Sequence, residues 1–116
     1  MSAALSEIYT VKRAVINHGG TGVEAIVAAV TDKPITVLDY VITEAAGAAA
    51  AFTWKSATTA LSGAMALAAR ASLVVPEARR GLLQTAAGAA LNIDSATVLT
   101  GHLSYIDWTS GRAQTE

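Results

Sequence analysis

The chain has 116 residues, which fits one domain, and a formal net charge of −1 without any basic tract. Direct binding of nucleic acid through phosphate neutralisation is therefore not expected. Apolar residues make up 53% of the chain and charged residues only 15%, against roughly 25% charged residues in an average domain. Much of the surface is expected to be small and apolar, or to be buried against other subunits. The lack of cysteine excludes disulfides and thiolate metal sites.

The N-terminal segment MSAALSEIYTVKR has no basic region followed by an apolar one, so we expect no signal peptide. The chain also lacks an uninterrupted apolar run of membrane-spanning length, so we expect no transmembrane helix. Residues 1–8 are predicted to form a short arm. Leu5 and Ile8 stand among small polar residues there, which suits an extended segment that orders against a partner.

Two strands are predicted near the start, Tyr9–Asn17 and Val23–Val30, joined by a flexible glycine-rich hairpin loop. A turn at residues 31–34 leads to the clearest strand of the chain, Ile35–Thr43, which is rich in β-branched and aromatic residues. Both faces of this strand are partly apolar, which suits a core on one side and a subunit contact on the other.

Simple alternation along residues 35–43 places Leu38, Tyr40 and Ile42 on one face, and the remaining apolar residues, Ile35, Val37 and Val41, on the other. Asp39 lies among these apolar neighbours. We expect it to form an ion pair with Lys55 or Arg13, or across a subunit interface.

Two alanine-rich stretches, Glu44–Ala51 and Ser62–Ala71, have the propensity of helices because alanine is the best helix former. Both contain glycine, however, and both lie between strand-like segments. We therefore predict β-strand or extended loop in both, with a helical turn as the alternative. Between them, Phe52 and Trp54 alternate with polar residues and predict a short strand with aromatic side chains facing the core.

A short strand at Leu73–Val75 is predicted to end at Pro76, and a charged loop follows it. Glu77, Arg79 and Arg80 in this loop are interpreted either as a solvated surface or as a docking loop that meets an acidic patch on a partner.

The last third of the chain contains three more predicted strands. Leu82–Thr85 and Ala90–Ile93 flank a plausible hairpin turn. In Val98–Ile106, Leu99, Leu103 and Tyr105 share one face, and His102 lies on the other. Residues 107–116 read as a polar tail. Trp108 in this tail is expected to anchor on a neighbouring subunit or partner, since an exposed tryptophan is costly.

No combination of residues predicts catalysis. The glycine-rich segment at 18–22 lacks the Gly-Lys-Ser/Thr ending of a phosphate-binding loop. The two histidines, His18 and His102, have no carboxylate at a short spacing that would complete a metal site, and the nine carboxylates are scattered. We therefore expect no enzymatic activity, no metal and no cofactor.

Four blocks of sequence carry a resemblance to a class of virus proteins. They read AIVAAVTDKPITVLDYVITEAAG, FTWKSATTALSGAMALAA, RGLLQTAAGAALNI and VLTGHLSYI, in that order, and the resemblance covers residues 25–105. Together they resemble the small β-sandwich virion proteins of tailed bacteriophages. In those proteins a strand follows a Lys-centred turn. A hairpin containing W/F-K-S, a hairpin containing T-A-A-G, and a last strand ending G-H-L-x-Y come after it.

The resemblance implies an all-β fold, a single-domain jelly-roll-like β-sandwich over residues 9–106, with short terminal extensions at 1–8 and 107–116. It also implies a non-enzymatic virion protein. The reading that fits best is a homotrimeric capsid decoration (cement) protein that binds the major capsid protein on the outer surface of the phage head and stabilises the shell. The alternative is a receptor- or glycan-binding head-fibre or tail-tip module.

These readings single out two sets of residues. The first set is expected to bind the capsid partner: Leu5, Ile8, Arg79, Arg80 and Trp108. The second set is expected at the subunit interface: Asp39, Val41 and His102. Neither nucleic acid nor a membrane is an expected partner.

Overall fold

The computed structural model describes residues 11–78 and 81–107. Within these residues the chain forms β-strands and no helix. The strands are β1 (Lys12–Gly19), β2 (Gly22–Val27), β3 (Ile35–Glu44), β4 (Ala50–Ser56), β5 (Thr59–Ala60), β6 (Met65–Leu67), β7 (Ser72–Val75), β8 (Leu83–Gln84), β9 (Leu91–Ser95) and β10 (Val98–Asp107).

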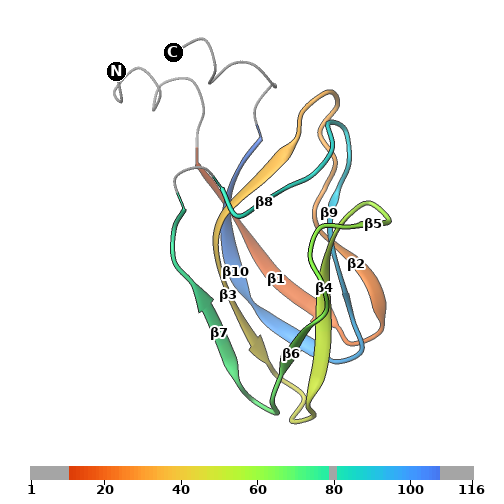
Figure 1. Cartoon of the computed structure of the whole chain (residues 1–116), viewed down its shortest axis with the longest axis vertical. Coiled ribbons are helices and arrows are strands. Elements are labelled where there is room, and N and C mark those ends of the chain that lie inside the picture. Colours follow the sequence, from red (N-terminus) through yellow and green to blue (C-terminus); the bar gives the residue numbers. More distant parts are fainter. Residues whose placement is uncertain (1–10, 79–80, 108–116) are drawn as a thin grey trace.

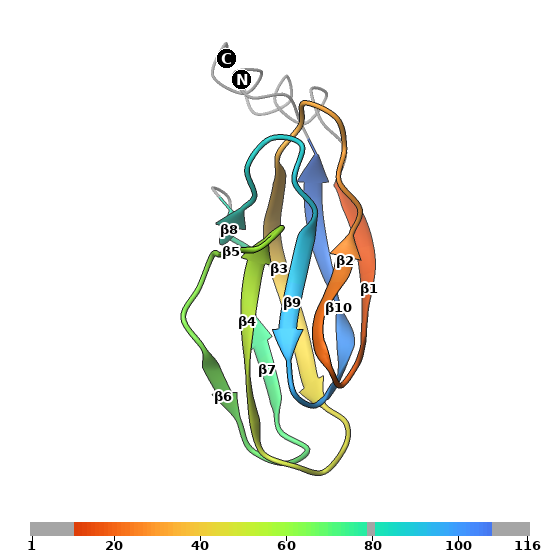
Figure 2. The same ribbon diagram turned by 90° about the vertical axis from the view of Figure 1, so that its right-hand side faces the viewer.

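The strands form two antiparallel five-stranded sheets that pack face to face (Figures 1 and 2). Sheet A has the order β1-β10-β3-β7, with β8 pairing along β3 beyond β7. Sheet B has the order β2-β9-β4-β5, with β6 also pairing with β4. The chain passes between the sheets at most turns, so neighbouring strands in the sequence usually lie in different sheets. This arrangement confirms the all-β sandwich; the jelly-roll topology stays a prediction.

The core lies between the sheets and is built from the inward-facing residues of both. Its largest side chains are Trp54 and Phe52 of β4, which are fully buried. Tyr40 and Trp54 meet edge to face with ring centroids 5.0 Å apart, and Phe52 and Trp54 do so at 6.5 Å. Leu99 and Leu103 of β10 complete the centre from sheet A, as the alternation of that strand predicts.

A β-bulge in β3 corrects the faces expected from simple alternation. Ser104 of β10 pairs with Asp39, but the next residue, Tyr105, pairs with Val37, so Leu38 is an extra residue in β3. The bulge moves Ile35 and Val37 onto the same core-facing side as Tyr40 and Ile42, instead of the opposite side. Val41 still faces outward. The carbonyl of Leu38 accepts a hydrogen bond from Ala78 N–H at 2.9 Å, so the segment after β7 satisfies the backbone at the bulge.

The alanine-rich stretches form strand and loop without a helical turn, as predicted, because tertiary pairing outweighs the helix propensity of alanine. Residues 45–49 form the loop between β3 and β4, and residues 65–67 form β6. The predicted hairpin at residues 82–93 is wrong. β8 pairs with β3 in sheet A and β9 pairs with β2 and β4 in sheet B, so this segment crosses from one sheet to the other.

Candidate interaction face

The outer face of sheet A carries a row of three valines and one histidine that crosses all four main strands. Val15 of β1 pairs with His102 of β10, His102 pairs with Val41 of β3, and Val41 pairs with Val74 of β7. Paired residues on adjacent strands point to the same side of a sheet. These four residues, called here the valine row, therefore lie side by side across the sheet.

Glycine at position 101 lets the central strands approach closely enough to hold this row. A Cβ atom at Gly101 would lie 1.9 Å from the carbonyl oxygen of Val41, and the residue has a φ of 149°. No other residue fits this position without moving β10 away from β3. The register of the row thus depends on one residue of the Gly-His-Leu sequence.

The ends of the valine row are strongly exposed. Val15 is 73% exposed and Val74 is 65% exposed, while Val41 between them is half-buried. Val11, just before β1, is 53% exposed and continues the same alternation. Scattered apolar residues are normal on a protein surface, whereas an aligned group on one face of a sheet makes that face a candidate interaction site.

The rows beside the valine row are small or charged. On one side lie Asn17, Thr100, Thr43 and Ser72, in register across the same four strands. The hydroxyls of Thr43 and Ser72 are hydrogen-bonded to each other at 2.8 Å. On the other side lie Arg13, Ser104 and Asp39, and that row leads to Pro76 and Glu77 after the end of β7.

The three residues predicted at a subunit interface come together on this face. Val41 and His102 are direct neighbours in the valine row, and Asp39 lies one row away. Asp39 forms neither of the ion pairs expected within the chain. Its carboxylate accepts a hydrogen bond from Ser104 N–H at 3.2 Å, while Lys55 lies in sheet B and pairs with Asp94 at 3.4 Å.

The five residues predicted to bind the capsid partner, Leu5, Ile8, Arg79, Arg80 and Trp108, lie outside the described residues. Sequence reasoning missed Val15 and Val74, the two most exposed members of the valine row. The alternation of Val11, Arg13, Val15 and Asn17 gave a usable signal that β1 has an apolar outer side. Their alignment with Val41 required the strand order, which the sequence does not provide.

The outer face of sheet B provides a contrast. Among its described residues, the exposed large apolar side chain is Val23 of β2, at 45% exposure. Its cross-strand neighbours Asp94 and Thr53 are polar, and the Lys55–Asp94 ion pair covers the centre of this face. Only sheet A therefore presents an aligned apolar row.

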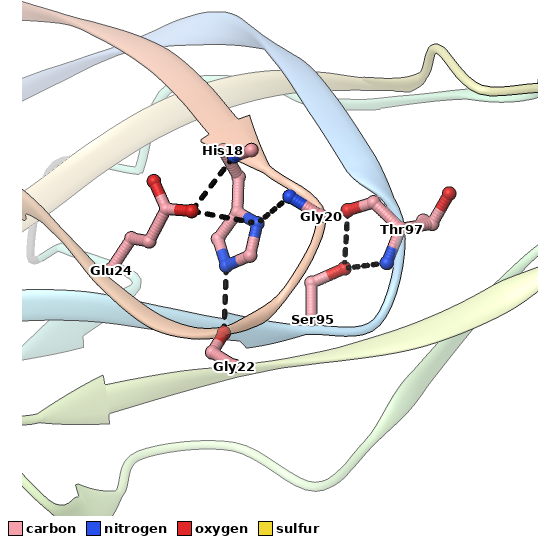
Figure 3. A network of polar contacts seen from close by, with 7 residues as sticks. His18, Gly20, Gly22, Glu24, Ser95 and Thr97 are labelled. Carbon is pink, nitrogen blue, oxygen red and sulfur yellow. Dashed lines mark hydrogen bonds and ion pairs between the residues drawn. The ribbon is translucent and has the colours of Figure 1, made fainter.

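The predicted hairpin at the β1–β2 turn is wrong, because β1 and β2 lie in different sheets. A buried histidine holds this turn in place (Figure 3). His18 Nδ1 accepts a hydrogen bond from Gly20 N–H at 2.9 Å, and Nε2 lies 2.7 Å from the carbonyl oxygen of Gly22. This arrangement requires the neutral tautomer with its proton on Nε2. Glu24 Oε2 accepts from Gly19 N–H at 2.8 Å and lies 3.7 Å from His18 Nδ1. These contacts hold the turn and engage both ring nitrogens of His18.

A second buried polar residue, Glu44 at the end of β3, holds together other loops at the same end of the sandwich. Its carboxylate accepts hydrogen bonds from the N–H groups of Ala46, Gly47 and Arg70 at 2.8 Å each, and from the hydroxyl of Thr97. The Thr97 hydroxyl and these backbone donors lower the pKa of Glu44 to about 2 from its ordinary value of 4.5, although burial acts in the opposite direction. Glu44 is therefore a structural anion that joins the β3–β4, β6–β7 and β9–β10 connections.

Both polar clusters use their polar atoms to hold loops together. Within residues 11–78 and 81–107, no group of three or more His, Cys, Asp or Glu residues is placed to hold a metal ion. The described part of the chain also has no helix of the length and apolarity needed to cross a membrane. Comparisons with protein families, curated proteins and solved structures give no match.

Proposed function

We propose that this protein is a non-enzymatic structural protein of a phage virion. In its most specific form, the proposal is a homotrimeric capsid decoration protein, with the jelly-roll type of sandwich, that sits on the outer surface of the head. It contacts the major capsid protein there and stabilises the shell. The observation that carries the proposal is the outer face of sheet A, where an aligned apolar row is available for protein contacts in addition to the core.

The physical logic follows from size and surface. A domain of 116 residues buries a modest core. Association with copies of itself buries further apolar area such as the valine row. A protein that binds the assembled shell but not its separated subunits stabilises the shell by mass action. The similarity of residues 25–105 to small phage virion proteins supports the same reading.

The local chemistry is consistent with a scaffold. Glu44 and His18, the buried ionisable residues that stand out, each have their polar atoms engaged in holding loops. The large aromatic residues Tyr40, Phe52 and Trp54 are used in the core. The remaining feature that an external partner could contact is the outer face of sheet A. A face of this kind is better suited to binding another protein surface than to binding a small ligand.

Imaging of intact particles tests the proposal. Heads that contain the protein should show external density that is missing from heads made without it, in groups of three at the junctions of capsid subunits. Density inside the shell, or density confined to the tail or to fibres, would contradict the decoration role and would favour the receptor- or glycan-binding alternative.

A further inference from the structure

We propose that two copies of this chain pack face to face through the outer face of sheet A. The two-fold axis lies in the interface, between β10 and β3, and runs close to the direction of those strands. This inference identifies what covers the valine row and does not depend on a capsid. It competes with the homotrimer of the proposed function, because a two-fold contact gives assemblies with an even number of chains. Face-to-face packing at a spacing of about 10 Å is the usual way in which two sheets bury apolar faces.

The strand order makes the face complementary to itself. An axis between the two middle strands of the order β1-β10-β3-β7 places β1 over the partner's β7, and β10 over the partner's β3. Because the valine row is one cross-strand row, Val15 then meets the partner's Val74, and His102 meets the partner's Val41. Each contact occurs twice. The two most exposed valines of the row thus cover each other.

The neighbouring polar row allows the same approach. Rotation about this axis places Asn17 near the partner's Ser72, and Thr100 near the partner's Thr43. These side chains are short and uncharged, so no like charges meet and no long side chain separates the two sheets. Hydroxyl and amide groups there can exchange hydrogen bonds with one another or with trapped water.

The charged row adds complementary charges at the rim. Arg13 of one copy lies opposite the partner's segment after β7, which carries Glu77. Arg13 and Glu77 are both exposed, and neither has an ion pair within the described residues. Their long side chains can bridge the ~10 Å spacing of stacked sheets. The two copies therefore form two equivalent ion pairs, and each copy supplies one member of each pair.

The size of the sheet A face determines how strongly the two copies are expected to associate. Four strands about 4.8 Å apart, with rows of outward residues repeating about every 6.8 Å, give a flat footprint of roughly 400 Å² over three or four rows. Because side chains project from the sheet, the accessible surface that is buried is larger than this footprint. The contact therefore buries roughly 600 Å² per copy, near the lower end of the size range of specific interfaces. We therefore expect a dissociation constant in the micromolar range, on the order of 1–50 µM.

Sedimentation equilibrium and native mass spectrometry of the full chain test the inference. The wild-type protein should form assemblies with an even number of chains. Val15→Asp and Val74→Asp should each raise the dissociation constant by about a hundredfold, because each places two charges in an apolar contact. Val23→Asp is the matched control: this valine is also exposed on a strand, but on sheet B, and its substitution should leave association unchanged. Because the substituted side chains are exposed, the variants should stay folded, and a thermal unfolding curve checks this.

A charge exchange gives an independent readout. Arg13→Glu and Glu77→Arg should each weaken association by about tenfold, because each sets like charges opposite one another. The double variant restores the pair in reversed order and should recover wild-type association. Failure of this rescue would overturn the assigned axis.

The other outcomes separate this inference from the proposed function. Three-chain assemblies, or monomers up to ~500 µM (about ten times the weakest expected dissociation constant), would overturn the two-fold contact, and so would equal effects of the Val23 and Val15 variants. A protein that pairs as described but leaves no density on phage heads would support the contact and contradict the capsid role.

Discussion

At the scale of single residues, a few positions determine how the two sheets are held. Gly101 lets β10 lie against β3, and Glu44 joins three connections at one end of the sandwich. Neither role can be predicted from composition, because each depends on an atom that is far away in the sequence. Gly101 faces a carbonyl of residue 41, and Glu44 meets donors from residues 70 and 97.

Substitution of Gly101 by alanine should destabilise the protein strongly. The added Cβ would overlap the carbonyl oxygen of Val41, and backbone cannot move aside as a flexible side chain can. We expect a loss of about 2–4 kcal/mol in the free energy of unfolding, measured by denaturant titration. Gly63→Ala is the control: nothing lies within 4 Å of a Cβ there, so its effect should stay below about 0.5 kcal/mol. Equal effects at the two positions would show that the close approach at residue 101 is not real.

Glu44 should make stability fall in acid within a defined pH range. Its pKa is about 2 in the folded protein against an ordinary value of 4.5, so the folded state binds fewer protons than the unfolded state between these values. The stability that Glu44 provides is complete above pH 4.5 and is lost as pH falls from 4.5 through 2. Glu44→Gln should lower stability at neutral pH and flatten this dependence. Asp32→Asn, at an exposed carboxylate in the turn before β3, should retain this pH dependence. An unchanged slope in Glu44→Gln would contradict this account.

At the scale of strands, hydrophobic alternation predicted most elements but not their exceptions. β10 alternates from Leu99 to Leu103, so these two leucines were assigned to the core correctly. β3 does not, because Leu38 is an extra residue whose carbonyl bonds outside the strand pair. The segment at residues 82–93 looks locally like a hairpin, yet its halves pair with different sheets. Long-range pairing decides both cases, and a single sequence carries little signal of it.

The aromatic side of β4 is the strand feature on which the core depends most. Phe52→Ala should cost about 3–5 kcal/mol in unfolding free energy, because it removes a fully buried ring and leaves a cavity beside Trp54. Thr53→Ala, on the opposite side of the same strand, should cost less than about 1 kcal/mol. A small loss for Phe52→Ala in thermal or denaturant unfolding would place this side of β4 outside the core.

At the scale of the whole molecule, the sequence predicted a sandwich with an apolar second face, and the structure locates that face. Val41 and His102 were selected from two separate strands and lie together in the valine row. The row itself could not be predicted, since its outer members Val15 and Val74 come from strands whose order in the sheet is set by tertiary pairing. The predicted arm, charged loop and Trp108 lie outside the described residues and stay predictions.

The dependence of attachment on salt should distinguish the role of the arm from that of the charged loop. Deletion of residues 1–8 should weaken attachment to phage heads about equally at low and high salt, because its contacts are expected to be apolar and backbone-mediated. Replacement of Arg79 and Arg80 by alanine should weaken attachment more at low salt, since exposed charges are screened beyond about 10 Å at 0.1 M. Co-sedimentation at two salt concentrations measures both. Wild-type attachment of both variants would exclude these segments as docking elements.

Co-sedimentation of the purified protein with phage heads that were made without it tests the central claim most directly. The account predicts saturable binding to the outside of the heads, at a fixed ratio to the major capsid protein. It also predicts that the decorated heads resist heating better than bare ones, because binding only the assembled shell shifts its equilibrium. Heads that take up no protein at concentrations well above micromolar, with no change in their thermal stability, would contradict it.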